Sequence, residues 1–513
     1  MLEQAPSIGQ SALDACDAAL RWLVGSSHGS TYAVSRWIFL RALGLIFLIA
    51  FVSLWVQVKG LIGSQGILPA QDLLRSAQTQ LGPERYRLLP TLFWVNASDT
   101  ALSVVCAMGS AAALALVADI APTVMLVLLW ALYLSLTVVG RDFLSFQWDV
   151  LLLETALLAL FVAPRNLFPG RAGGAVSALG LVLLWWLLFR LSFASGLVKL
   201  TWGDPTWRHL TALDYHFWTQ PLPTWTAWFM QQLPAWMKRL SVLGTFVLEI
   251  GFPLLIFGPR PLRLVACAGI VLMQLGIFAT GNYNFFNLLT IALALLLIDD
   301  LLWTRVLPDS LLRWSGAGSA DAAWRPPGVV AISLGLLLLV ASTLRFAQTL
   351  APGAPGAGPP GVVLGWLEPF RSINGYGLFR VMTTGRREIV LEGSDDGATW
   401  RAYELKYKPG DVSRRPRFVE PHQPRLDWQM WFAALSEYEA TPWFQGLLVR
   451  LLQGSPPVLR LLAANPFPDH PPRYVRALLY DYRFATPAQR RATGAWWTRT
   501  LLGAYSPVVS LRP

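Results

Sequence analysis

The chain has 513 residues, of which 54% are hydrophobic and only 14% are charged, and it carries 24 tryptophans and a formal net charge of +11. Soluble domains contain about 25% charged residues, so this composition argues against a string of soluble domains and indicates a membrane protein with several spans. The three cysteines form no CxxC pair, which argues against a thiolate zinc site or a redox-active pair.

The N-terminal segment, residues 1–35, is polar and amphipathic and lacks the basic and apolar regions of a cleavable signal peptide. Residues 36–348 predict a transmembrane bundle of eight or nine helices, because a span needs about 20 mostly apolar residues and two of the nine runs are short. The nine runs lie near 36–58, 100–118, 122–139, 148–163, 175–198, 240–258, 262–280, 285–303 and 328–348.

Two long connections, 59–99 and 199–239, interrupt this bundle, and the second is rich in tryptophan and proline, as an interfacial segment would be. Basic residues near the short loops favour a cytoplasmic N-terminus, which with nine spans places the C-terminal residues across the membrane. The excess of basic residues also fits a surface near anionic headgroups, so we expect membrane lipids and no nucleic acid as partners.

The composition changes after the last run. Residues 349–362 read as a Pro/Gly linker, and residues 363–513 as a soluble α+β domain. In this domain GYGLFRVMTT, REIVLEGSDDG, TWRAYELKY and PPRYVRALLYDYRFA alternate as strands do, whereas LDWQMWFAALSEY and TPWFQGLLVRLLQG show helical spacing. The predicted fold is a polytopic α-helical membrane protein with a C-terminal soluble α+β domain.

Four ionisable residues fall within the predicted spans: Asp149, Glu154, Arg190 and Glu249. Charges in hydrocarbon usually face a partner or a cavity, so these side chains predict either a polar pocket or structural pairing between helices. We favour structural pairing. A proton-coupled transporter also fits these residues, although no internal repeat or pair of half-length spans is evident.

Signals for catalysis are few. The five histidines lack the spacing of a zinc site, and the sequence contains no GxSxG elbow, Walker A motif or GxGxxG motif. We therefore expect no metal and no cofactor, and we assign no catalytic residue.

The segment GNYNFFNLLTIALALLLIDD, residues 281–300, is apolar in the middle and polar at both ends. Asn282 or Asn284 is expected to cap a helix that begins near Phe285. Asn287, one turn further, is expected to bond to a neighbouring helix. The aspartate pair at the other end is expected to mark the exit of a span into the headgroup region.

Four segments resemble the lipase maturation factor family, whose animal members lie in the endoplasmic reticulum membrane. They are the segment just quoted, LVKLTWGDPTWRHLTALDYHFWTQPLPTW (197–225), FVEPHQPRLDWQMWFAAL (418–435) and LLYDYRFAT with GAWWTRTLLGAYSP (within 478–507). They occur in order across most of the chain from about residue 36. The arginine-rich composition suggests a bacterial-type member, whose place would be the inner membrane.

The resemblance implies a membrane factor that assists folding and assembly of an exported lipase-like client through exposed apolar and aromatic surface. Candidates for this surface, and for a polar network that holds the long loop to the C-terminal domain, come from the matching segments. They are Asp204, Trp207, His216, Trp218 and Gln220 in the loop, and His422, Arg425, Asp427, Trp428 and Trp431 in the domain.

Two alternatives stay open at this point. One is a membrane-embedded enzyme acting on a lipid or lipid-linked group, which predicts a deep pocket with a convergent acid–base pair drawn from Arg190, Glu154, Glu249 or His216. The family's distant similarity to membrane proteins that include the vitamin K-dependent carboxylase supports this reading. The other is a transporter, which predicts a mid-membrane cavity with discontinuous helices. A maturation factor predicts paired charges and an exposed aromatic patch instead.

Overall fold

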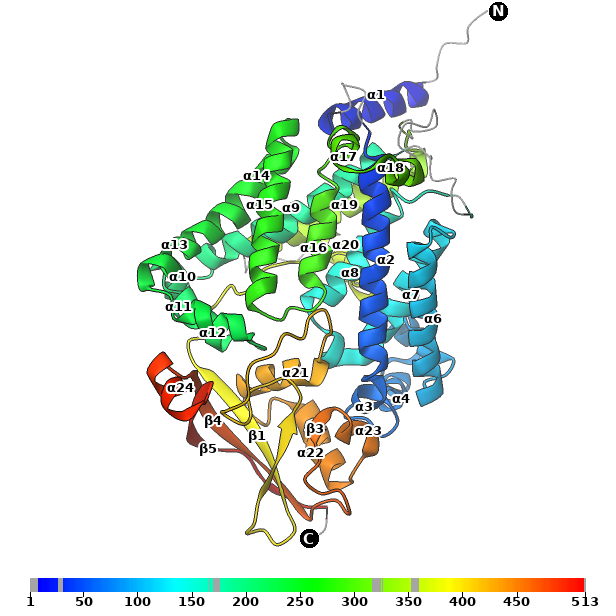
Figure 1. The fold of residues 1–513 in the computed structure, drawn as a ribbon. Coiled ribbons are helices and arrows are strands. Elements are labelled where there is room, and N and C mark those ends of the chain that lie inside the picture. Colours follow the sequence, from blue (N-terminus) through cyan, green and yellow to red (C-terminus); the bar gives the residue numbers. More distant parts are fainter. Residues whose placement is uncertain are drawn as a thin grey trace, which may run out of the picture.

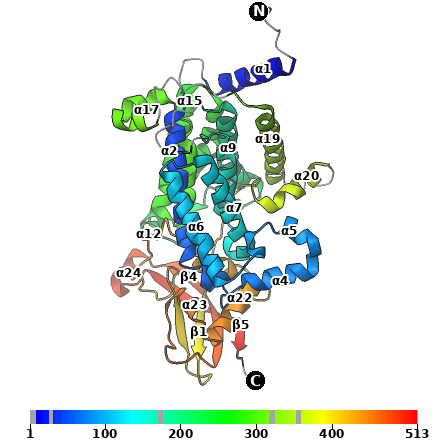
Figure 2. The same cartoon turned by 90° about the vertical axis from the view of Figure 1, so that its right-hand side faces the viewer.

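A computed structural model describes residues 8–25, 31–165, 167–168, 176–315, 324, 326–351 and 359–511. It shows a bundle of long helices with a region of strands and short helices at one end (Figures 1 and 2). The amphipathic helix α1 (Ile8–Leu23) lies at the opposite end of the bundle. Half of the predicted Pro/Gly linker, 349–362, falls on residues 352–358, which lie outside the described residues, and its two ends belong mostly to helices that end at Leu350 and begin at Pro359.

Within the described residues, seven helices are long and apolar enough to cross a membrane. The predicted runs 122–139 and 240–258 both become 23-residue helices, the second of which contains a π-helical turn at Val247–Gly251. The seven are α2 (Ala33–Trp55), α6 (Asp99–Val117), α7 (Pro122–Gly140) with its extension to Leu144, α9 (Ala178–Thr201), α13–α14 with the turns around them (Ala235–Phe257), α15 (Arg260–Thr280) and α19 (Val329–Leu350).

Two predicted runs form shorter helices inside the bundle. Helix α8 (Gln147–Ala159) has 13 residues and α16 (Phe286–Leu295) has 10, both less than the roughly 20 that a span needs. After α16 the chain bends by 105° into α17 (Asp300–Val306), so the described helices give seven spans, or eight if the bent pair is one span. Most residues of α8 and α16 are buried against other helices, and their length is therefore not set by the lipid.

The bend at the end of α16 comes from the aspartate pair. Asp299 caps α17 by accepting the N–H of Leu302 at 3.2 Å, and Asp300 accepts the N–H groups of Ala33 and Val34 at 3.0 and 2.9 Å, at the start of α2. Both carboxylates are buried. They satisfy backbone donors at two helix starts, and the expectation that they mark an exit into the headgroups stays a prediction.

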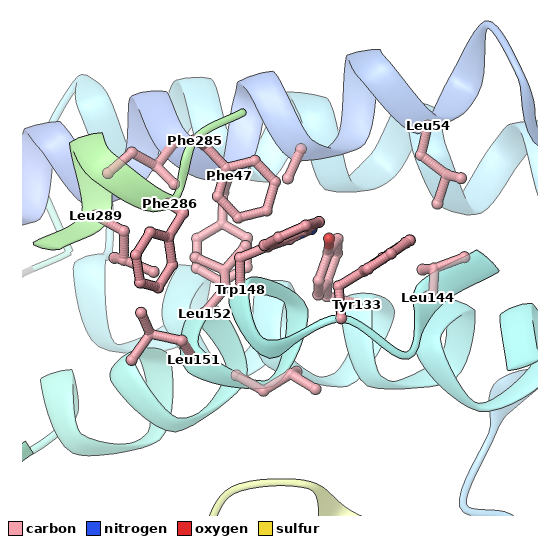
Figure 3. Close-up of a cluster of buried hydrophobic side chains, with 14 of the residues drawn as sticks. Phe47, Leu54, Tyr133, Leu144, Trp148, Leu151, Leu152, Phe285, Phe286 and Leu289 are labelled. Carbon is pink, nitrogen blue, oxygen red and sulfur yellow. The ribbon is translucent and has the colours of Figure 1, made fainter. Parts of the chain in front are cut away.

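The core of the bundle lies between α2, α7, α8 and the start of α16. Phe285, Phe286 and Leu289 pack in one cluster with Trp148 and Phe47, as Figure 3 shows. All are buried. The apolar centre of the 281–300 segment therefore faces protein more than lipid.

The two long connections are mostly helical. The first lies beside the strand region at the lower end of the bundle, and the second extends from α9 to α13 along the same end (Figures 1 and 2). Their helices are α3 (Val58–Ile62), α4 (Ala70–Leu81), α5 (Arg85–Leu88), α10 (Pro205–Arg208), α11 (Leu213–Thr219) and α12 (Trp225–Gln231).

The C-terminal region contains a five-stranded antiparallel sheet with the strand order β3-β2-β1-β4-β5. The Asp-Asp-Gly turn joins β1 to β2, as the sequence predicts, whereas GYGLFRVMTT forms no strand because its residues pack on the bundle. The elements are β1 (Arg386–Ser394), β2 (Arg401–Leu405), β3 (Leu462–Ala464), β4 (Tyr474–Phe484), β5 (Trp497–Val509), α21 (Arg425–Ala434), α22 (Pro442–Leu452), α23 (Pro456–Leu459) and α24 (Pro487–Thr493). Helix α18 (Asp309–Ser315) lies beside α17 at the other end of the bundle, and α20 (Pro359–Leu367) follows α19. The protein is thus a polytopic helical membrane protein whose C-terminal region combines a small sheet with helices.

Candidate functional site

The predicted site residues gather where the lower end of the bundle meets residues 368–511, a boundary that we call the junction. Glu154 of α8 and Arg190 of α9 form a buried ion pair there. The other oxygen of Glu154 accepts hydrogen bonds from the Tyr376 hydroxyl at 2.6 Å and from the Asn374 side chain at 3.0 Å. Arg190 also donates to the Asn374 carbonyl at 3.1 Å. The intramembrane pair is therefore built into the first segment of the C-terminal region.

A second buried pair joins Asp149 of α8 to Arg425 of α21. Both guanidinium Nη atoms donate to the carboxylate, at 2.9 and 2.8 Å. The Tyr133 hydroxyl donates to Asp149 at 2.5 Å, and Arg425 also donates to the Phe143 carbonyl at 2.6 Å. A buried charge is stable only when it is paired and hydrogen-bonded in this way.

The third pair consists of Lys199 at the end of α9 and Glu249, whose carboxylate lies 2.6 Å from the ammonium. Lys199 also donates to the Ser195 carbonyl at 2.9 Å and lies 5.2 Å from the centre of the Trp207 ring. Glu249 sits in the π-helical turn, which places an extra residue in the helix and turns this side chain inward.

Each of the four intramembrane residues singled out from the sequence thus has an opposite charge as its partner. A catalytic acid–base pair needs a group that is free to take or give a proton within reach of a substrate. In the part of the chain that the structure describes, no cluster of three or more His, Cys, Asp or Glu side chains could hold a metal ion. This arrangement favours helix packing over chemistry.

The loop residues Asp204 and Trp207 tie the second long connection to the C-terminal region. Asp204 caps α10 by accepting the Thr206 N–H at 2.7 Å, and its other oxygen accepts the N–H of Met382. Trp207 is buried and donates from its indole to the Phe379 carbonyl at 2.8 Å. Trp207 therefore serves this packing and offers no surface to a partner.

Arg386, at the start of β1, holds the next part of the loop. Its guanidinium donates to the carbonyls of Trp218 at 2.9 Å, of Pro221 at 2.9 Å, and of Gln220. The Gln220 side chain in turn accepts from the Tyr283 hydroxyl at 2.9 Å. Trp218 is buried, so its expected role as exposed surface is wrong.

His216 lies inside this packing, with its ring centre 4.9 Å from that of Phe379 in an edge-to-face arrangement. Burial, together with the nearby positive charge of Lys199, lowers the pKa of the imidazole to about 4. His216 is consequently neutral at physiological pH and acts here as an aromatic packing residue.

The three asparagines of the 281–300 segment do not cap α16. The sequence predicts such a cap for Asn282 or Asn284. Asn282 instead donates to the carbonyls of Leu222 and Arg417, at 3.0 and 2.8 Å, and accepts the N–H of Val419 at 2.7 Å. Asn284 has a positive φ of 54° and its side chain accepts the N–H of the following residue. Tertiary partners for Asn282 outweigh the local cap, because residues 417–420 offer both a donor and an acceptor.

Asn287 bonds to the C-terminal region and not to a neighbouring helix. Its amide donates at 3.5 Å to Glu420, which also accepts the N–H of Tyr283. Burial raises the pKa of the Glu420 carboxyl to about 8, against the lowering effect of these two hydrogen bonds. Glu420 was missed by sequence reasoning, because a single glutamate between valine and proline carries no pattern.

Two further candidates in the C-terminal region are also occupied by structural contacts. The His422 ring lies 2.9 Å from the Ser53 hydroxyl of α2, and burial with the nearby Arg425 lowers its pKa to about 4. Asp427 accepts the N–H groups of Tyr407 and Lys408 at 2.8 and 3.1 Å. Burial nevertheless raises the pKa of the Asp427 carboxyl to about 6.

One open feature of the junction is a cavity of about 700 Å³, which we call the aromatic groove. Trp428 and Trp431, both singled out from the sequence, form one wall, and Trp428 packs edge-to-face on Trp148 at 4.7 Å. At its mouth the Phe432 side chain is 42% exposed. The aromatic side chains that line the groove are Phe146, Trp148, Trp202, Tyr283, Phe379, Trp428, Trp431 and Phe432.

These eight side chains come from five separate parts of the chain, which explains why sequence reasoning found only some of them. Trp148 and Tyr283 lie next to predicted spans and read as core residues. Phe379 falls in the segment that resembles a strand but has a positive φ of 54°. The signal that could have found them is the density of aromatic residues at the ends of spans, where amphipathic rings favour an interface.

Comparisons with known proteins agree with this arrangement. A family model described as the lipase maturation factor transmembrane domain matches residues 34–305, and one described as the lipase maturation factor C-terminal domain matches residues 372–507. The chain is 40% identical to lipase maturation factor 2 of Homo sapiens, over 93% of this chain and 82% of the relative. It is 35% identical to lipase maturation factor 1 of Bos taurus, over 94% and 90%. No solved structure matches the chain.

Proposed function

Because the chain belongs to the lipase maturation factor family, we propose that it is a membrane-embedded factor that assists folding and assembly of exported lipase-like proteins. The relatives are named lipase maturation factors, and the chain matches them over nearly all of its length. We further propose that the junction faces the extracytoplasmic side, in the bacterial inner membrane or, as for the eukaryotic relatives, in the endoplasmic reticulum membrane.

The observation that carries the proposal is the contrast between the paired intramembrane charges and the open aromatic groove. Each of the four intramembrane candidates is neutralised by a partner, so an enzyme that needs a free acid or base is not favoured. The bend between α16 and α17 lies at the end of the bundle (Figure 1), whereas a transporter needs discontinuous helices at mid-membrane. The groove, in contrast, presents apolar surface to an incoming chain.

The groove suits transient holding of a partly folded client. Burying one Leu or Phe side chain of a client contributes about 2 kcal/mol, and ordering that side chain costs about 1 kcal/mol. Two or three such side chains would thus bind weakly and reversibly. A maturation factor needs this balance, because the client must leave once its own core has formed.

Deletion of the gene tests this function, with the secreted proteome and secreted lipase activity as the readouts. We expect a selective loss of active secreted lipase with its transcript unchanged, and recovery when the gene is returned on a plasmid. A strain whose secreted enzymes are untouched while its membrane lipids change would contradict the proposal and favour an enzyme acting on lipid.

A further inference from the structure

A second cavity, of about 780 Å³, lies beside the aromatic groove and shares Gln147, Trp202, Gly377 and Arg380 with it. We call it the basic cavity. It is lined by residues near the C-terminal ends of α7, α9 and α19, which all run toward the junction (Figures 1 and 2). The cavity therefore lies at the C-terminal ends of three predicted spans.

Three arginines and one glutamate line the basic cavity. Arg345 lies 3.8 Å from the exposed carboxylate of Glu368, and Arg380 stacks at 4.3 Å on the Trp202 ring. Arg371 has no carboxylate within 4 Å among the described residues, since Asp149 is taken by Arg425. The cavity thus holds an uncompensated positive charge of about two guanidinium groups, which matches a bound anion.

The rest of the lining suits an amphiphile. The amides of Gln147 and Gln348 supply polar groups, while Leu89, Val138 and Val198 make the remainder apolar. A soluble anion would gain nothing from aliphatic side chains in its site. A lipid, in contrast, brings a phosphate and hydrocarbon together.

The rim of the cavity carries a short helix suited to the membrane surface. Gly365, at the cavity edge, belongs to α20, whose outward side chains include Val362 and Trp366, exposed by 61% and 59%. Arg87 of α5 stacks over the Trp366 ring at 4.7 Å. Figure 2 shows α20 at the foot of α19 and beside α5. Exposed apolar side chains with tryptophan and arginine at one level are typical of an interfacial helix.

We propose that the basic cavity binds the phosphate of an anionic phospholipid, with Arg371 and Arg345 as the phosphate ligands and the acyl chains along α19 and α20. Paired guanidinium groups bind phosphate oxygens through charge-assisted hydrogen bonds. The exposed apolar side chains of α19, among them Leu337 and Val340, offer the adjacent surface for the chains. This site does not depend on the identity of the client.

The test uses the full chain in nanodiscs made of phosphatidylcholine with phosphatidylglycerol, followed by native mass spectrometry of the lipids that stay bound. We expect the wild type to retain phosphatidylglycerol in preference to phosphatidylcholine. Arg345→Gln with Arg371→Gln should reduce that preference about thirtyfold, since each arginine near anionic lipid contributes about 1 kcal/mol. The matched control, Arg75→Gln with Arg305→Gln, removes two exposed arginines elsewhere and should behave as the wild type.

A variant that is expected to bind more phosphatidylglycerol distinguishes a change in binding from a folding defect. Glu368→Gln removes the one carboxylate of the cavity and should raise the preference for phosphatidylglycerol. If the arginine-pair variant and its control lose the preference for phosphatidylglycerol equally, diffuse surface charge explains the binding and the proposal is overturned. A wild type without this preference would also overturn the proposal. Displacement of the lipid by millimolar inorganic phosphate would overturn a lipid source in favour of a free phosphate.

Discussion

Asp149 and Arg425 stand 276 positions apart in the sequence, and their side chains meet in a buried two-point ion pair of 2.8 and 2.9 Å. Asp149 belongs to the bundle and Arg425 to the C-terminal region. Neither charge could remain buried without the other, so the ion pair fixes the position of the C-terminal region on the bundle. The groove that we assign to the client is built across this same boundary.

Arg425→Gln should therefore destabilise the whole protein. Removing one partner leaves an uncompensated buried charge, which costs about 3–5 kcal/mol. Unfolding by denaturant in detergent micelles measures this loss. The double variant Asp149→Asn with Arg425→Gln should lose less free energy of unfolding than the two single variants together. Strict additivity would show that the pair is not coupled. The exposed pair Arg75–Asp72, at 3.9 Å, is the control, and Arg75→Gln should change stability by less than about 0.5 kcal/mol.

Glu420 should make stability fall as the pH rises from about 4.5 to about 8. Burial raises the pKa of this carboxyl from 4.5 to about 8, so the folded state binds a proton that the unfolded state has lost. The contribution of Glu420 to the free energy of unfolding is fully present below pH 4.5 and is lost as the pH rises through 8. The slope is at most about 1.4 kcal/mol per pH unit.

Thermal unfolding of the purified protein from pH 6.5 to pH 8.5 measures this effect. Over this window His216 and His422, whose pKa values are lowered to about 4 by burial, are neutral in the folded state and add little slope. Glu420→Gln should flatten the curve, whereas Glu437→Gln, an exposed carboxylate, should leave it unchanged. An unaltered slope in the Glu420 variant would mean that another group titrates.

Arg386→Lys should loosen the loop that carries α11. The guanidinium donates to three carbonyls within residues 218–221, and a lysine ammonium cannot place donors at all of them. Loss of one hydrogen bond to a charged donor costs about 2 kcal/mol. Hydrogen exchange should accelerate in 213–232 by about thirtyfold. Arg387→Lys, the exposed neighbour on β1, should leave exchange unchanged, and equal exchange in both variants would count against this anchor.

The helices show how much of the fold can be predicted from the sequence. A segment in lipid must satisfy its own backbone, so a long apolar run becomes a helix almost regardless of its neighbours. This rule predicts the seven long helices. It fails for α8 and α16, because both are enclosed by other helices and neither has to match the thickness of the membrane.

The site was harder to predict, because its residues act through distant partners. The sequence marks Glu154 and Arg190 as costly charges, and only the fold shows that they bond to each other. Asn282 has the local chemistry of a helix cap, yet two carbonyls and an N–H from distant segments are its hydrogen-bond partners. The groove depends in the same way on packing between segments, which no spacing in the sequence records.

The client site itself can be tested with two phenylalanines that are equally exposed, at 42% each. Phe432 lies at the mouth of the aromatic groove, whereas Phe418 packs against Trp225 outside it. Phe432→Arg should weaken the binding of an apolar client segment by about thirtyfold, because a lost apolar contact of this size contributes about 2 kcal/mol. Secreted lipase activity should fall accordingly in a strain that carries this variant in place of the wild type.

Phe418→Arg is the matched control and should support normal lipase secretion at the same level of membrane protein. Both side chains are on the surface, so both variants should fold and accumulate alike, which blotting of the membrane fraction can establish. Equal lipase activity in the two strains would refute the groove as the client site and leave the family role without an assigned surface. A loss confined to Phe432→Arg would instead connect the geometry of the junction to maturation, since the two variants share the new charge and the size of the change.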